Sequence, residues 1–118
     1  MKEPRRFVRI QAQLPVTYRV LPSPAKIRST TCDVAGSGLC LLVQEPLARG
    51  AQVQLELRLP DRDRPVTATG EVMWCEHHRV VGKSEQQDLI KTGVRFLHLD
   101  GHDQDAILQY VASHLQST

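Results

Sequence analysis

Alternation of apolar and polar side chains with a period of two most constrains how this chain can fold. In residues 8–20, one face of an extended segment carries Val8, Ile10, Ala12, Leu14, Val16, Tyr18 and Val20. The same alternation returns in residues 53–59. Successive side chains of a strand point to opposite faces, so both segments are predicted to be half-buried β-strands. Pro15 lies on the opposite phase and cannot donate to a sheet ladder, so we expect an edge position or a bulge there.

The other apolar runs are short and separated by turn-forming residues. They predict further strands at 25–33, 39–43, 66–74 and 93–97. Tight or polar loops are expected from Asp33 to Gly38 and over 82–91. After Asp100, a plausible helix cap, apolar residues repeat at helical spacing, which predicts a helix over 100–116. Six antiparallel strands followed by one helix predict a mainly β fold, a small six-stranded β-barrel with a C-terminal α-helix packed against it.

Size and composition limit the class of protein. The chain has 118 residues, enough for a single domain, with 41% hydrophobic and 24% charged residues, which is typical of a globular protein. We expect residues 1–9 to be a flexible basic arm, 10–99 a barrel and 100–116 a helix. No apolar run approaches the roughly 20 residues of a membrane span, and no signal peptide is evident, so a cytoplasmic protein without membrane insertion is predicted. Three cysteines without a CxxC pair argue against a disulfide framework.

Positive charge is concentrated at the N-terminal end, although the net charge of the whole chain is only +2. Residues 1–10 contain one acidic residue, Glu3, and four basic residues, which are Lys2, Arg5, Arg6 and Arg9. Of the 15 basic residues, 11 are arginines. The planar guanidinium fork suits a phosphate or a base edge better than the point charge of lysine does. This distribution predicts a small anionic partner at the N-terminal end.

Two short motifs gain meaning from their order and spacing. Arg5-x-x-x-Arg9 precedes the first predicted strand, and Asp33-x-Ala35-x-x-Gly38 falls between the second and the third. This arrangement resembles the PilZ domain family, whose signature is RxxxR followed by [D/N]xSxxG. The resemblance covers about residues 4–116 and continues through Gly50, the alternation to Pro60, Gly70-Glu71-Val72, Trp74, Gly93-Val94-Arg95-Phe96 and the final helix.

The resemblance implies a six-stranded barrel that binds the bacterial second messenger cyclic di-GMP, with no catalytic activity, no cofactor and no metal ion. It assigns Arg5 and Arg9 to the phosphates and guanine edges, while Asp33 and Gly38 complete the site. Arg6 lies beside them and is expected to assist. Guanidinium groups pair with phosphate oxygens and with the O6/N7 edge of guanine, and a carboxylate accepts from the guanine N1–H and amino groups.

Ala35 departs from the family signature, because a serine usually stands there. The missing hydroxyl removes a hydrogen bond worth about 0.5–1.5 kcal/mol net, or up to roughly tenfold in affinity. Ser37 lies two residues further on and is the candidate to compensate. Cyclic di-GMP binding is therefore predicted to be weakened and not abolished.

We expect the ligand to order the N-terminal arm, and we expect the domain to signal through this change to an unidentified protein partner. One alternative is a degenerate PilZ domain that serves only as a protein-interaction module. Another is a small nucleic-acid-binding barrel, which needs exposed aromatic residues; only 4% of the chain is aromatic, so no nucleic acid is expected. Cys75-Glu76-His77-His78 contains metal-capable residues but lacks a second pair at ligand spacing, so no metal site is predicted.

Replacing Arg5 or Arg9 with alanine is expected to weaken cyclic di-GMP binding by about 1.5–3 kcal/mol, because charged hydrogen bonds are lost. The free energy of unfolding should barely change, since both residues lie in the N-terminal arm. Calorimetric titration of each variant measures the loss. Titration curves identical to those of the wild type for both variants would refute the assignment.

Overall fold

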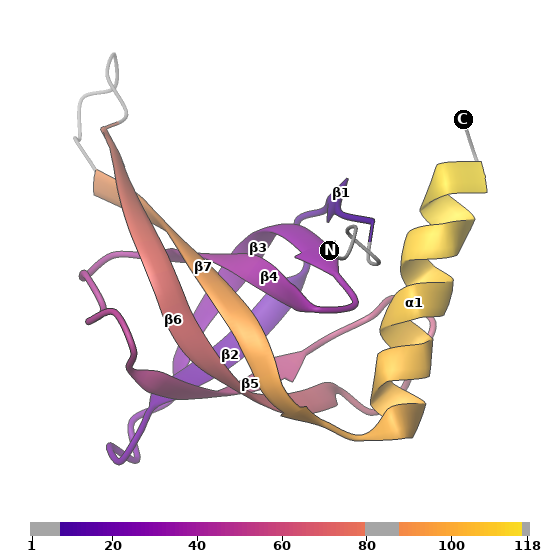
Figure 1. The fold of residues 1–118 in the computed structure, drawn as a ribbon, viewed down its shortest axis with the longest axis horizontal. Helices are drawn as coiled ribbons and strands as arrows, with labels where there is room; N and C mark the ends of the chain where they lie inside the picture. The colour runs from indigo at the N-terminus through magenta and orange to yellow at the C-terminus, as the bar shows by residue number, and fades with distance from the viewer. Residues whose placement is uncertain (1–7, 80–87, 117–118) are drawn as a thin grey trace, which may run out of the picture.

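The computed structural model describes residues 8–79 and 88–116, which form seven strands and one helix (Figure 1). The elements are β1 (Ile10–Gln11), β2 (Pro15–Val20), β3 (Ile27–Ala35), β4 (Gly38–Val43), β5 (Gln52–Leu57), β6 (Val66–Arg79), β7 (Asp88–Leu99) and α1 (Gly101–Gln116). Six strands pair in the order β3-β2-β5-β6-β7-β4, and β4 pairs back to β3 to close an antiparallel barrel. The two-residue β1 adds to β3 beside β2. The predicted fold, a mainly β six-stranded barrel with a C-terminal helix, is confirmed.

The single strand predicted over residues 8–20 is divided into β1 and β2 by a break just before Pro15. Thr31 of β3 is fully buried and spans this break. Its Oγ1 donates to the Ala12 carbonyl oxygen at 2.6 Å and accepts from the Leu14 amide at 3.0 Å. The Thr31 amide in turn donates to the Leu14 carbonyl oxygen at 3.0 Å. One buried hydroxyl thus replaces ladder hydrogen bonds that the interrupted strand cannot make.

Two predicted loops are shorter in the structure. The prediction of a loop from Asp33 to Gly38 is wrong, because Ala35 pairs with Gly38 and only residues 36–37 form the turn. The loop expected over 82–91 is also wrong at its end: 88–91 belong to β7, while 80–87 lie outside the described residues. The β6–β7 pairing extends to Arg79 and Asp88. Apolar alternation does not continue through Glu76 and His77, so the periodicity argument does not detect this end of the strand.

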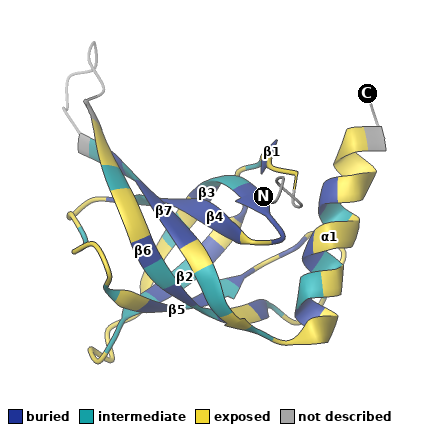
Figure 2. Ribbon diagram, in the orientation of Figure 1, coloured by how far each residue is buried: buried dark blue, intermediate teal, exposed yellow. Residues whose placement is uncertain are grey.

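The barrel interior is filled by the apolar phase of its strands, seen as dark blue segments in Figure 2. Helix α1 lies beside the end of the barrel that holds β1 and the β3–β4 turn (Figure 1). Ile107 and Val111 of the helix are buried in the same core. Asp103 Oδ2 accepts from the Thr67 amide at 3.2 Å, and Gln104 Nε2 donates to the Gly36 carbonyl oxygen at 3.1 Å. The helix is therefore fixed both to β6 and to the β3–β4 turn.

Thr31→Val is expected to lower the free energy of unfolding by about 1–3 kcal/mol, because the Leu14 amide and Ala12 carbonyl lose their buried partner. Urea denaturation measures the effect. Thr30→Val is the matched control, since Thr30 is the neighbouring residue in β3 and is exposed. Equal losses in the two variants would contradict a bridging role for Thr31.

Candidate ligand-binding site

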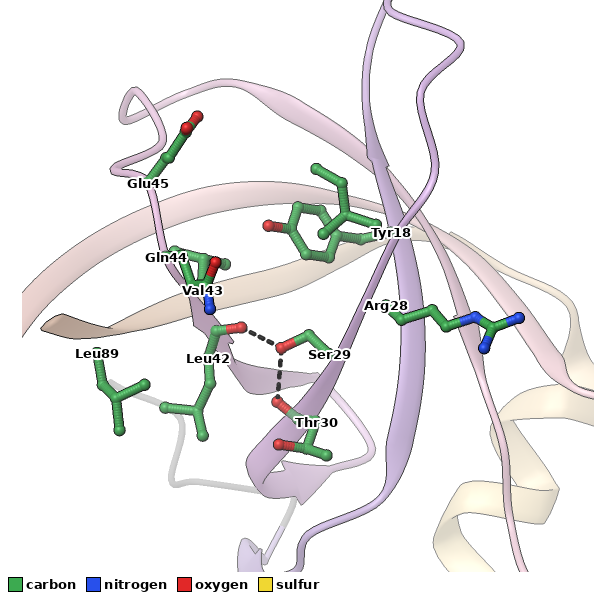
Figure 3. A pocket seen from close by; sticks show the side chains of 10 residues that line it. Tyr18, Arg28, Ser29, Thr30, Leu42, Val43, Gln44, Glu45 and Leu89 are labelled. Carbon is green, nitrogen blue, oxygen red and sulfur yellow. Dashed lines mark hydrogen bonds between the residues drawn. The ribbon is translucent and has the colours of Figure 1, made fainter. Parts of the chain in front are cut away.

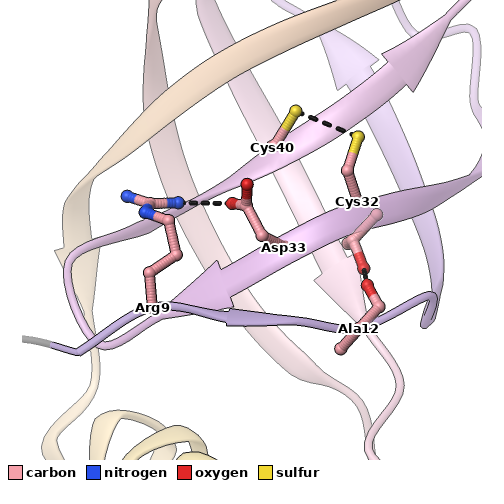
Figure 4. Close-up of polar contacts among 6 residues, drawn as sticks. Arg9, Ala12, Cys32, Asp33 and Cys40 are labelled. Atoms are coloured by element: carbon pink, nitrogen blue, oxygen red, sulfur yellow. Dashed lines mark hydrogen bonds and ion pairs between the residues drawn. The ribbon is translucent and has the colours of Figure 1, made fainter.

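An ion pair joins the two sequence motifs. Figure 4 shows Arg9 and Asp33 pointing toward one another, with Arg9 Nη1 2.5 Å from Asp33 Oδ1. The short strand β1 creates this contact, because it pairs Ile10 with Val34 and Gln11 with Asp33 and so carries Arg9 to the end of β3. The side chains remain 48% and 26% exposed, so the pair contributes little to stability, about 0–1 kcal/mol. Within the described residues, Arg9 is the partner of the Asp33 carboxylate, and it contacts Oδ1.

A β-bulge in β3 sets the direction of Asp33. Thr31 pairs with Leu41 and Asp33 pairs with Cys40, so Cys32 is the extra residue. Strict alternation from the inward-facing Thr31 would place Asp33 inside the barrel. The bulge shifts the phase by one residue, so Asp33 lies on the outer surface and Val34 is buried in the core.

A second bulge, in β6, forms the opposite wall. Val72 pairs with Val94 and Trp74 pairs with Gly93, which leaves Met73 as the extra residue. Both Met73 and Trp74 are exposed, and the Trp74 side chain lies directly against Gly93, where any Cβ would collide with the indole ring. The bulge thus places a flat aromatic surface on the outside of the barrel.

A hollow of about 250 Å³ lies between the two walls. It is lined by Arg9, Asp33, Ser37, Gly38, Leu39, Met73, Trp74, Gly93, Val94 and Arg95. At one side, Arg95 Nε and Nη2 donate to Glu71 Oε1 at 3.0 and 2.8 Å. Two guanidinium groups, one carboxylate and one indole therefore face the same space. This set of groups suits a planar, anionic ligand that also carries hydrogen-bond donors.

The structure brings together three of the six residues predicted for the site: Arg9, Asp33 and Gly38. Arg5 and Arg6 lie outside the described residues. Ala35 is fully buried and does not line the hollow. Gly38 meets the backbone of β7, since a Cβ there would collide with the Val94 carbonyl oxygen. Close packing of β4 on β7 is thus a sufficient reason for a glycine at this position.

Sequence reasoning missed Met73, Trp74 and Arg95. Trp74 lies at the end of the strand predicted over 66–74, and its side chain is 47% exposed. The pairing of Trp74 with Gly93 is the signal that could have indicated an exposed indole at the hollow. It can be recognised only once the β6–β7 register is known. These three residues therefore depend on tertiary structure for their assignment.

A larger hollow of about 580 Å³ lies between β3 and β4, where the two strands separate (Figure 3). It contains none of the predicted site residues. The Ser29 hydroxyl donates to the Leu42 carbonyl oxygen across its inner end. Tyr18 lines it, and burial, helped by the nearby Glu45 carboxylate, raises the pKa of that phenol. Arg28 extends away from the other labelled side chains (Figure 3), so this hollow lacks the convergent cations of the first.

Neither a metal cluster nor a membrane span is found in the part of the chain that the structure describes. No group of three or more histidine, cysteine, aspartate or glutamate side chains within 8–79 and 88–116 is placed to hold a metal ion. The described helix is not long and apolar enough to cross a bilayer.

The fold is a small antiparallel β-barrel domain with a charged hollow on one face. The model of the PilZ domain family matches residues 3–113, and the chain belongs to this family. No curated protein matches it by sequence.

Solved structures share the fold at low sequence identity. The inhibitor of motility MotI/DgrA of Bacillus subtilis has a TM-score of 0.79 at 22% identity, covering 99% of this chain and 54% of that one. The PilZ domain of Escherichia coli YcgR, solved with c-di-GMP, has a TM-score of 0.73 at 19% identity, covering 98% and 93%. The K. pneumonia MrkH complex with c-di-GMP has a TM-score of 0.73 at 13% identity, covering 98% and 54%. The chain thus spans about half the length of the MotI and MrkH chains.

Gly93→Ala is expected to displace the Trp74 indole, because the new methyl group occupies the space of the ring. Trp74 is the only tryptophan of the chain, so its fluorescence emission reports the displacement directly, as a shift to longer wavelength. The free energy of unfolding should fall by about 1–3 kcal/mol, as in other overpacked sites. Gly101→Ala is the control, since nothing lies within 4 Å of a Cβ there. An unchanged emission spectrum in Gly93→Ala would contradict the contact.

Proposed function

We propose that this chain is a receptor domain for cyclic di-GMP and has no catalytic role. The observation that carries the proposal is the Arg9–Asp33 pair, which unites the two family motifs at one open hollow. Family membership supports it, as do YcgR and MrkH, which were solved with c-di-GMP.

The chemistry of the ligand matches the groups at the hollow. Cyclic di-GMP carries two phosphate charges and two guanine bases. Arg9 retains N–H groups beyond the one that faces Asp33, and these suit a phosphate oxygen or the O6/N7 edge of guanine. Asp33 Oδ2 suits the guanine N1–H and amino groups. Arg5 and Arg6 belong to the same proposed site and would add positive charge from the N-terminal arm.

Trp74 and Arg95 extend the proposed site beyond the two motifs. The exposed indole offers a stacking surface for a guanine, and stacking on an aromatic side chain is worth about 1–3 kcal/mol per base. The Arg95 guanidinium is oriented by its two hydrogen bonds to Glu71 and lies on the rim of the same hollow. Ser37, which is exposed in the β3–β4 turn and lines the hollow, is placed to supply a hydroxyl that Ala35 lacks.

The proposed output is a change in the surface that a partner protein contacts. Ligand binding would neutralise the repulsion among the N-terminal arginines and order the arm that precedes Arg9 against the site. The Gln104–Gly36 hydrogen bond joins the β3–β4 turn to α1, which makes the helix a second element able to respond.

Calorimetric titration with cyclic di-GMP tests the proposal, with GTP and cyclic di-AMP as controls. We expect binding of cyclic di-GMP alone, and Asp33→Ala should weaken it by about 1.5–3 kcal/mol, because the carboxylate that accepts from the guanine donors is removed. Asp61→Ala, in an exposed loop, is the matched variant and should bind like the wild type.

Absence of cyclic di-GMP binding by the wild-type chain would overturn the receptor proposal and favour a PilZ domain that acts only as a protein-interaction module. Equal affinities of Asp33→Ala and Asp61→Ala would instead remove Asp33 from the site.

A further inference from the structure

Two thiols lie next to each other on the outer face of the β3–β4 hairpin. The Cys40 thiol donates to Cys32 Sγ at a sulfur–sulfur distance of 3.0 Å, and Figure 4 shows both side chains beside Asp33. The two thiols are neighbours because the bulge in β3 places both Cys32 and Asp33 opposite Cys40. A sulfur–sulfur bond is about 2.05 Å long, so a shift of about 1 Å would bring the thiols to bonding distance.

The two thiols differ in access to solvent. Cys40 is 2% exposed, whereas Cys32 is partly exposed. Burial, followed by the hydrogen bond to Cys32, raises the pKa of the Cys40 thiol. A soluble oxidant therefore meets Cys32 first, and Cys40 is held in place as the second thiol.

We propose that Cys32 and Cys40 form an oxidisable dithiol, a modification site at which a peroxide converts both thiols into an intramolecular disulfide. In the first step the Cys32 sulfur attacks hydrogen peroxide, the O–O bond breaks, and Cys32 becomes a sulfenic acid with release of one water. In the second step the Cys40 sulfur attacks Cys32 Sγ, the S–O bond breaks, and a second water leaves with the Cys40 proton. Two thiols are oxidised and one peroxide is reduced.

The disulfide would also act on the ligand-binding site, a consequence that rests on the proposed function. Asp33 follows Cys32 in the chain and is the register partner of Cys40. Drawing the two sulfurs together moves the backbone of the bulge that carries Asp33. Hydrogen bonds to a carboxylate depend on direction, so a shifted Asp33 holds a guanine less well. We expect cyclic di-GMP affinity to fall by about threefold to tenfold, the range of one hydrogen bond.

The chemical step is tested on the folded full chain with hydrogen peroxide, followed by thiol counting and peptide mass mapping. The free thiol count should fall from three to one, with the loss of two hydrogens and a linked Cys32–Cys40 peptide. Cys75→Ser is the matched control and should still form the link, because Cys75 contacts Leu47 and Thr92 and no cysteine. Cys32→Ser should form none. Three free thiols after treatment, or disulfides only between chains, would overturn the proposal.

The effect on the site is tested by titrating reduced, oxidised and re-reduced protein with cyclic di-GMP. Weaker binding after oxidation, restored by dithiothreitol and absent in Cys32→Ser, supports the coupling. Equal affinities of the oxidised and reduced forms would overturn it. If the reduced chain binds no cyclic di-GMP, the proposed function fails, and the thiol count and mass map still decide whether the dithiol exists.

Discussion

The bulge at Cys32 is the irregularity on which the rest of the molecule depends. It reverses the side-chain phase of β3, so that Thr31 and Val34 are both buried while Asp33 reaches the surface. Without the phase shift a carboxylate would lie in the apolar core, which costs several kcal/mol unless it is paired. Before the bulge, residues 27–30 of β3 pair with β2 and not with β4. From Thr31 onward, β3 pairs with β4, and this pairing closes the barrel.

The second bulge, at Met73, shapes one wall of the hollow. The bulges at Cys32 in β3 and at Met73 in β6 flank β4 and β7, which pair with each other without a register shift. Gly38 and Gly93 of the inner strands line the hollow, and the Trp74 indole lies against Gly93 because that residue has no Cβ. Bulges aim side chains that a regular strand cannot, which is why they cluster beside functional sites.

The residues that stabilise the fold differ from those of the proposed binding site. The barrel interior and the buried face of α1 carry the apolar contacts that stabilise the fold. The charged groups of the hollow are exposed and contribute little to the free energy of unfolding. Variants of Arg9, Asp33 or Arg95 can therefore report on a ligand without unfolding the chain. The Gln104–Gly36 hydrogen bond is the point at which the helix meets the binding face.

The barrel and the terminal helix were predictable from the sequence, because alternation and helical spacing are local properties of the chain. The motif residues Arg9, Asp33 and Gly38 were singled out by the resemblance to the PilZ family. The break before Pro15, the bridging Thr31 and the length of the β6–β7 hairpin were not. Trp74 beside Gly93, and Cys32 beside Cys40, likewise emerged only from strand register. Register depends on pairing between segments distant in sequence, and one bulge inverts which face a residue occupies. The sequence by itself thus determined which chemical groups the protein has and the class of its fold, and the tertiary structure decided which of those groups meet.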